Sequence, residues 1–260
     1  MPHTYLDSYG VKLDIEVDDG DLLPAVEAIL PPGWTRSEEF PEDGHFTIRT
    51  QANGSYSVFA EGNFVATDVP REVALHVLDA QVRARVALLA RDRIFVHAGA
   101  VAVGDRALLL PGPSFTGKST LVAALVAAGA TYYSDEFAVL DAEGRVHPYP
   151  RLLSIRQEDK RFGDYTDVVL LGGAAGSEPA RAALIAITRY NPDARWDPQT
   201  RNSGVGALGL MTNTVSARSR PEAATRAVAR AAAGARVLEG DRGDAAETAE
   251  VMLTALESAA

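Results

Sequence analysis

The sequence contains no cysteine among its 260 residues. This absence excludes disulfide bonds, thiolate metal sites and a cysteine nucleophile, and it favours a cytoplasmic location. Basic residues are also scarce relative to acidic ones, 25 against 35, which gives a formal net charge of −10. A surface for nucleic acid or for anionic lipid needs concentrated positive charge. We therefore expect neither nucleic acid nor a membrane as a partner.

Long apolar runs are absent as well. No stretch approaches the roughly eighteen uninterrupted apolar residues of a membrane-spanning helix. The first residues lack the basic and apolar regions of a signal peptide. The composition, 47% hydrophobic and 23% charged, is typical of a globular chain that buries a core. These features predict a soluble, cytoplasmic, globular protein.

The pattern of the chain changes near residue 90. Before it, strand candidates at 45–50 and 55–60 flank an Asn53-Gly54 turn, and a long amphipathic helix is expected over 70–90. Residues 1–90 are therefore predicted to form a small α+β unit. Beyond it, strands expected at 94–103, 107–110, 131–140, 182–188 and 235–238 alternate with helices expected at 120–128, 204–215, 221–233 and 244–257. This alternation predicts an α/β domain over residues 91–260.

One segment fits a phosphate-binding loop in full. Residues 112–119 match G-x-x-x-x-G-K-[ST], with an apolar strand before them and an apolar-periodic helix after them. The glycines let the backbone curl so that N–H groups point at phosphate oxygens, and the helix directs its positive N-terminus to the same place. The expected nucleotide-binding residues are Gly112, Pro113, Ser114, Phe115, Thr116, Gly117, Lys118, Ser119 and Thr120.

Two side chains of this loop have specific expected roles. Lys118 would reach the β- and γ-phosphates, and the Ser119 hydroxyl would help to coordinate Mg²⁺. The predicted ligands are therefore ATP and Mg²⁺, with pyrophosphate or another polyphosphate donor left open.

Two acidic positions downstream compete for the metal and the chemistry. Asp135 and Glu136 follow a strand candidate, and neighbouring carboxylates beside a polyphosphate would hold Mg²⁺ or take a proton from an incoming hydroxyl. Asp141 also ends an apolar run, but it opens Asp-Ala-Glu-Gly, which is typical of a hairpin turn. We therefore predict Asp135 and Glu136 in the site and a turn role for Asp141.

The order of these segments resembles the catalytic domain of the HPr kinase/phosphorylases, whose P-loop fold is related to phosphoenolpyruvate carboxykinase. Three parts match: His97 in Val-His-Ala-Gly, the loop itself, and Asp135-Glu136, where Asp135 lies 17 positions beyond Lys118 (135 − 118) as in the family. The resemblance implies an α/β core of the HPr-kinase/carboxykinase type. It also implies that Asp135 is the general base, that Glu136 supports the metal site with Ser119 and Asp135, and that His97 lies near the transferred phosphoryl group.

The chain also departs from the family pattern. Phe115 stands where the family has glycine, and the family's downstream Glu-x-Arg-Gly segment has no clear counterpart. The acceptor is therefore left open as a protein, a peptide or a small molecule with a hydroxyl group, and the amino-terminal unit is the candidate recognition domain. Because related kinases form oligomers, a homo-oligomer is left open too. The sequence predicts an ATP-dependent kinase, with a non-catalytic nucleotide sensor that binds a partner as the alternative.

Arginines downstream are candidate contacts to the acceptor. The guanidinium group presents a planar fork of donors that can clamp a phosphate or a carboxylate. The candidates are Arg151, Arg156, Arg189 and Arg201. The segment Asp-Arg-Gly-Asp at 241–244 is interpreted as a turn glycine followed by a helix cap at Asp244.

Overall fold

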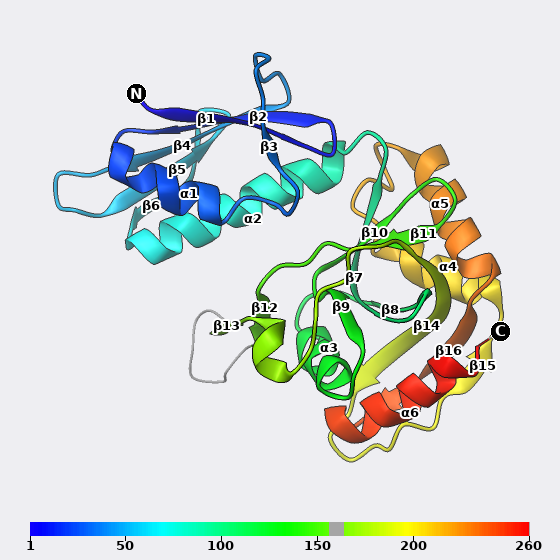
Figure 1. Cartoon of the computed structure of the whole chain (residues 1–260). Coiled ribbons are helices and arrows are strands. Elements are labelled where there is room, and N and C mark those ends of the chain that lie inside the picture. The colour runs from blue at the N-terminus through cyan, green and yellow to red at the C-terminus, as the bar shows by residue number, and fades with distance from the viewer. Residues whose placement is uncertain (156–163, 260) are drawn as a thin grey trace. The chain divides into compact units, whose positions relative to one another are not determined.

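The structure is a computed structural model of the chain, and it describes residues 1–155 and 164–259. The chain divides into two compact units, Met1–Asp92 and Arg93–Ala260, and each is described by itself (Figure 1). No helix in the described ranges is both long enough and apolar enough to cross a membrane.

The amino-terminal unit is a six-stranded sheet with two α-helices. The strand order is β3-β1-β2-β4-β5-β6, and the neighbours are antiparallel except for the parallel pair β2–β4. The elements are β1 (His3–Ser8), β2 (Val11–Val17), α1 (Leu23–Ala28), β3 (Thr35–Arg36), β4 (Gly44–Thr50), β5 (Tyr56–Ala60), β6 (Asn63–Val69) and α2 (Arg71–Leu89), with a 3₁₀ turn at Gly20–Leu22.

Alternating side chains explain this sheet. In β2, Val11, Leu13, Ile15 and Val17 are fully buried, whereas the residues between them are partly exposed. A period of two is the pattern of a strand with one face on a core. The hairpin expected around Asn53-Gly54 is confirmed as β4–β5, and Gly54 has a φ of +82°.

The carboxy-terminal unit is built on an eight-stranded mixed sheet. Its order is β11-β10-β7-β8-β14-β16-β15, and β9 also pairs with β7. The strands are β7 (Ile94–Val103), β8 (Arg106–Pro111), β9 (Thr131–Ser134), β10 (Phe137–Leu140), β11 (Arg145–His147), β14 (Ala180–Tyr190), β15 (Gln199–Arg201) and β16 (Arg236–Arg242); β12 (Leu153–Ile155) and β13 (Asp164–Thr166) form a separate pair.

Helices cover both faces of this sheet (Figure 1). One core contains residues of α3 (Lys118–Ala127) and α6 (Ala245–Glu257), and a second core contains residues of α4 (Ser203–Thr212) and α5 (Pro221–Ala233). A 3₁₀ turn lies at Val168–Leu171. Strand β8 contributes Leu108 and Leu110 to the first core and Leu109 to the second, which explains why its sequence is apolar without alternation. The expected mixed α/β architecture is confirmed.

The parallel strands determine where a ligand can bind. Strands β8, β14 and β16 run parallel as neighbours, so their carboxyl ends at Pro111, Tyr190 and Arg242 meet at one edge of the sheet. Ligands of open α/β sheets bind at the carboxyl ends of the strands. The loop at 112–117 leaves β8 at this edge.

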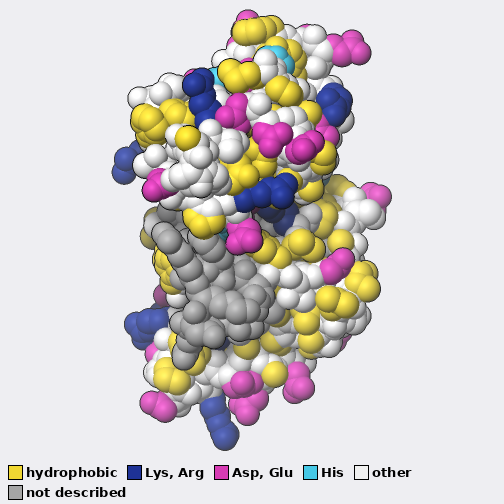
Figure 2. All heavy atoms as spheres, turned by 90° about the vertical axis from the view of Figure 1, so that its left-hand side faces the viewer, with side chains coloured by type: hydrophobic (Ala, Val, Ile, Leu, Met, Phe, Trp, Pro, Cys, Tyr) yellow, Lys and Arg dark blue, Asp and Glu magenta, His cyan; other side chains and the backbone are white. Residues whose placement is uncertain are grey.

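Charges of both signs are distributed over the surface. On the described part of the face drawn in Figure 2, acidic and basic side chains are interspersed with apolar ones. The expectation that nucleic acid is not a partner stays a prediction.

Candidate phosphate-binding site

Residues 112–117 form a tight turn between β8 and α3. Phe115 and Gly117 have positive φ values of +70° and +78°, and α3 begins directly after Gly117. Thr116 Oγ1 donates to the Pro113 carbonyl at 2.9 Å and closes the turn. Glycine adopts a left-handed conformation without a steric cost, whereas the largely exposed Phe115 is strained there. Backbone strain of this kind is concentrated at ligand sites.

Lys118 is buried inside the turn, with 8% of its surface exposed. Its Nζ donates to the Gly112 carbonyl at 2.8 Å and to the Pro113 carbonyl at 2.7 Å. Burial lowers the pKa of Lys118 to about 8, although the negative charge of Asp135 acts in the opposite direction. A cation bonded to neutral carbonyls in this way is suited to bind an anion more strongly than its present partners.

Asp135 lies against the first turn of α3. Its carboxylate accepts hydrogen bonds from Ser119 Oγ at 2.8 Å, from Tyr132 Oη at 2.9 Å and from the Ser154 N–H at 3.2 Å. Burial, together with the charge of Asp135, raises the pKa of Tyr132, so the phenol remains a donor. The contact between Ser119 and Asp135 joins the start of α3 to the bend that holds Asp135.

A break in the sheet places Asp135 in this position. Residues 131–140 are expected to be continuously extended, but the structure divides them into β9 and β10, which both pair with β7. Asp135 and Glu136 form the bend between them, where the Ala98 N–H donates to the Glu136 carbonyl and the Glu136 N–H donates to Ser134 Oγ. Such irregularities redirect side chains beside functional sites. The role of Glu136 in a metal site stays a prediction.

His97 supports the start of the loop from β7. Its Nδ1 lies 2.9 Å from the Gly112 carbonyl, which also accepts from Lys118. Because a carbonyl oxygen only accepts, this contact places a proton on Nδ1. The structure therefore brings His97, Lys118, Ser119 and Asp135 together.

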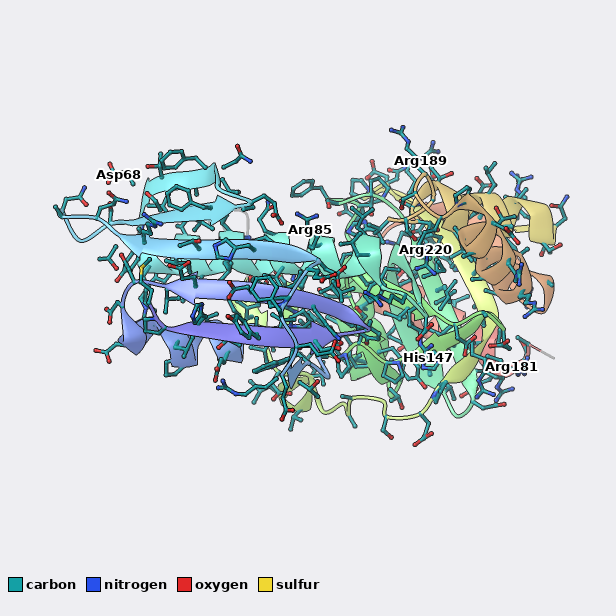
Figure 3. All side chains as sticks on the ribbon, turned by 90° about the horizontal axis from the view of Figure 1, so that it is seen from above. Asp68, Arg85, His147, Arg181, Arg189 and Arg220 are labelled. Atoms are coloured by element: carbon teal, nitrogen blue, oxygen red, sulfur yellow. The ribbon has the colours of Figure 1, made fainter. Side chains whose placement is uncertain are left out.

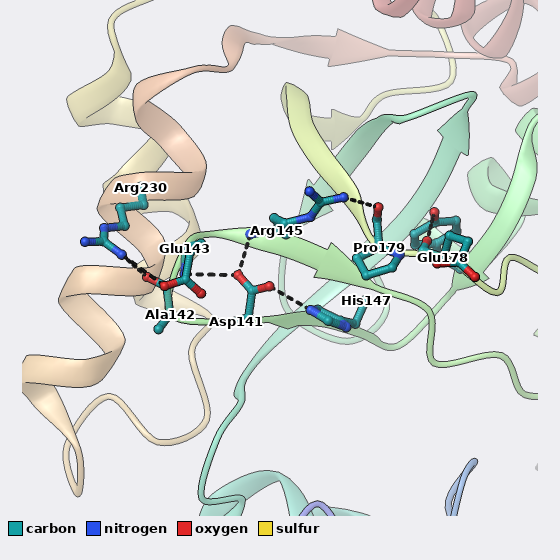
Figure 4. Close-up of polar contacts among 9 residues, drawn as sticks. Asp141, Ala142, Glu143, Arg145, His147, Glu178, Pro179 and Arg230 are labelled. Carbon is teal, nitrogen blue, oxygen red and sulfur yellow. Dashed lines mark hydrogen bonds and ion pairs between the residues drawn. The ribbon is translucent and has the colours of Figure 1, made fainter.

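Asp141 lies outside this cluster and has the expected turn role (Figure 4). Its carboxylate accepts from the N–H groups of Glu143 and Arg145 at 3.0 and 2.8 Å, and it lies 2.8 Å from His147 Nε2. Burial raises the pKa of Asp141, but the hydrogen bond with His147 and those from the backbone outweigh it, so the pKa lies below its usual value.

The downstream arginines have partners of their own. Arg189 points outward (Figure 3) and donates to both oxygens of Asp241 at 2.8 and 3.0 Å. Arg201 Nε lies 2.7 Å from Glu239. These two ion pairs line an open groove of about 490 Å³ at the ends of β14 and β16. Arg151 acts electrostatically on Tyr132, and Arg156 lies outside the described residues.

Arg242 is the site residue that the sequence analysis missed. Only 2% of its surface is exposed, and its Nη2 donates to the carbonyls of Gly117 at 2.9 Å and Thr116 at 3.4 Å. The cap at Asp244 is confirmed by hydrogen bonds from the N–H groups of Ala246 and Glu247. This cap accounts for Asp244 but not for the burial of Arg242. A strand that runs to residue 242 ends beside the loop, and this is the signal in the sequence that could have pointed to Arg242. The strand predicted from the sequence, 235–238, ends too early to show it.

The donor set fits Mg²⁺ bound with phosphate. Ser119 Oγ and Asp135 Oδ2 provide two hard oxygens that already lie 2.8 Å apart. Within the described ranges, no group of three or more His, Cys, Asp or Glu side chains could hold a metal ion. Mg²⁺ in nucleotide sites commonly has few protein ligands and completes its shell with phosphates and water.

Comparisons with known proteins add little to this geometry. No family model matches the chain, and no curated protein matches it either. Among solved structures, the chain is similar to the Hpr(Ser) kinase/phosphatase from Coxiella burnetii, at 14% sequence identity and a TM-score of 0.35, over 62% of this chain and 94% of that one. A TM-score at this level carries no argument about activity.

Proposed function

We propose that the protein is an ATP-dependent P-loop kinase that transfers the γ-phosphoryl group to a hydroxyl of a protein, a peptide or a small molecule. The observation that carries this proposal is the 2.8 Å contact between Ser119 Oγ and Asp135 Oδ2. Ser119 directly follows Lys118 in the chain. A buried carboxylate that contacts the hydroxyl of a phosphate loop lies where a nucleophile could be deprotonated.

Binding would use the backbone N–H groups of the loop, the N-terminus of α3 and Lys118. The Lys118 ammonium would exchange the Gly112 and Pro113 carbonyls for phosphate oxygens, which are stronger acceptors because they are charged. Mg²⁺ bound through Ser119 and Asp135, with support from Glu136, would neutralise charge on the transferred group. His97 would hold the Gly112 carbonyl and so keep the loop in place.

Asp135 would act as the general base. It takes the proton of the acceptor hydroxyl while the hydroxyl oxygen attacks the γ-phosphorus in line. The new O–P bond forms, the bond from the γ-phosphorus to the β,γ-bridging oxygen breaks, and ADP leaves with that electron pair. Tyr132 donates to Oδ1 of Asp135 and keeps the carboxylate oriented during the transfer.

A non-catalytic nucleotide sensor is the second candidate. It is favoured by one observation: Ser119, Tyr132 and Ser154 all donate to Asp135, so both carboxylate oxygens already accept hydrogen bonds. A carboxylate engaged in this way could report the occupancy of the loop without doing chemistry.

The decisive experiment combines γ-labelled ATP, the purified protein and fractionated host extract. Wild type should label an acceptor, and Asp135→Asn should bind ATP but transfer about a hundredfold more slowly or worse, because general base catalysis typically contributes about 10²–10⁴-fold. Asp141→Asn is the matched control and should transfer normally. Normal transfer by Asp135→Asn would rule out the base, and ATP binding without any labelled product would favour the sensor.

A further inference from the structure

We infer that Arg242 is a positioning residue of the phosphate site, which orients the two peptide groups whose N–H bonds would bind a polyphosphate. The inference rests on the proposed nucleotide binding, but it does not depend on phosphoryl transfer.

The contact is close and specific. Arg242 ends β16, and its Nη2 reaches the Gly117 carbonyl at 2.9 Å across 125 residues of sequence. A Cβ added to Gly117 would lie 2.4 Å from the same nitrogen. The positive φ of +78° favours glycine at this position, and a Cβ there would also displace the end of the Arg242 side chain.

The buried guanidinium of Arg242 has no carboxylate among its described hydrogen-bond acceptors, and the charge of Asp244 acts on it from nearby. The hydrogen bonds of Arg242 go to the main-chain carbonyls of Thr116, Gly117 and Gly243, and its Nε is buried with no acceptor in the described part of the chain. The Tyr190 ring lies 5.2 Å from the guanidinium carbon and covers it. Arginine does not release its proton in proteins, so burial cannot neutralise it. Together with Lys118 and the N-terminus of α3, Arg242 makes this edge of the sheet favourable for an anion.

The effect on phosphate would pass through the backbone. In a trans peptide the C=O and the N–H point in opposite directions. The carbonyls of Thr116 and Gly117 face Arg242, so the N–H groups of Gly117 and Lys118 in the same two peptides point away from it. A cationic donor on each carbonyl also polarises the peptide and strengthens its N–H as a donor. Arg242 would thus help to hold two phosphate donors in orientation without touching the phosphate, together with the Leu121 N–H, which also donates to the Gly117 carbonyl, at 3.1 Å.

The test uses inorganic tripolyphosphate as the probe, because it engages the loop and has no base or ribose. Arg242→Gln, measured by calorimetry in the full chain, should bind tripolyphosphate about tenfold to a hundredfold more weakly, the loss typical of a hydrogen bond to a charged group. Arg242→Lys, which keeps the charge but not the fork, should lie between the two. The matched control is Arg236→Gln, at the exposed start of the same strand, and it should bind as wild type does.

A second readout separates positioning from general packing. In the wild type, tripolyphosphate should shift the amide proton resonances of Gly117 and Lys118 strongly, and these shifts should shrink in Arg242→Gln while those of other loop amides persist. Unchanged affinity and unchanged amide shifts in a folded Arg242→Gln would overturn the inference and leave the proposed function intact. Failure of the wild type to bind either tripolyphosphate or ATP would instead remove the proposed function itself.

Thermal melting shows whether Arg242→Gln folds. If Arg242→Gln does not fold, Tyr190→Leu tests the inference instead, because this variant removes only the ring over the guanidinium. Tyr190 is 57% exposed, so its replacement should leave the fold intact. Tyr190→Leu should weaken tripolyphosphate binding several-fold at normal stability. A folded Tyr190→Leu with wild-type affinity would overturn the inference.

Discussion

Single buried side chains carry the electrostatics of the site. Lys118 and Arg242 are both cations at the same loop, and both are bonded to main-chain carbonyls. Asp135 is the carboxylate that acts on Lys118, and its own hydrogen bonds come from neutral donors. Two cations therefore lie where the sequence pattern predicts phosphate binding. The affinity for phosphate should depend on the protonation of Lys118.

Nucleotide affinity should fall as the pH rises above about 8, because the pKa of Lys118 in the free protein is lowered to about 8 by burial. Bound phosphate favours the charged ammonium and raises this pKa. Between the two pKa values the complex holds more protons than the free protein, so binding takes up a proton and weakens by up to about tenfold per pH unit. Calorimetry from pH 7.5 to 9.5 measures this slope.

The control is Lys118→Arg, which stays protonated over the whole range. Its remaining affinity should show little dependence on pH. A flat wild-type profile up to pH 9.5 would contradict the lowered pKa of Lys118.

At the scale of elements, close packing of α3 on β7 sets the position of the loop. Gly99 lies in β7, and a Cβ added there would lie 2.7 Å from Val122 Cγ2 of α3. The same strand carries His97, and both parts of the interrupted strand that holds Asp135 pair with it. Strand β7 therefore aligns three parts of the site.

Gly99→Ala should force α3 away from β7 and lower the free energy of unfolding by about 1–3 kcal/mol, the usual cost of overpacking a core. Urea denaturation measures it. Gly234→Ala is the matched control, because Gly234 has a φ of −99° and nothing lies within 4 Å of an added Cβ. Equal free energies of unfolding for the two variants would show that α3 can move away from β7 without loss of stability.

At the scale of the whole molecule, the chain has two units with separate sheets and separate helices. Every contact described for the phosphate site joins residues of Arg93–Ala260. The amino-terminal unit has its own buried residues, including Leu13, Phe46 and Leu78. Its role in acceptor recognition stays a prediction.

A chain of residues 93–260 alone should fold and bind tripolyphosphate with the affinity of the full protein, because it contains the whole site. It should lose transfer to the acceptor if the amino-terminal unit recognises that acceptor. Calorimetry and the labelling assay measure the two effects separately. A folded 93–260 chain that does not bind tripolyphosphate would show that the site needs residues 1–92.

Local patterns in the sequence predicted the elements that depend on local interactions. The helix expected over 221–233 has the bounds of α5, because Pro221 at its first position and the apolar spacing specify it without distant partners. The strand expected over 235–238 extends to Arg242 in the structure. Its last residues have the composition of a turn, so the sequence predicts an earlier end, but pairing with β14 keeps them extended.

The candidate phosphate loop is visible in the amino-acid order because the residues expected to bind phosphate, from Gly112 to Ser119, are contiguous and the turn uses the positive φ of Gly117. The partners of Asp135 and the place of Arg242 were decided by the tertiary structure alone. Pairing of parallel strands β8, β14 and β16 brings Arg242 to a loop 125 residues earlier, and no local pattern encodes that distance. Chemistry carried by one segment is visible in a sequence, whereas chemistry assembled across a sheet is not.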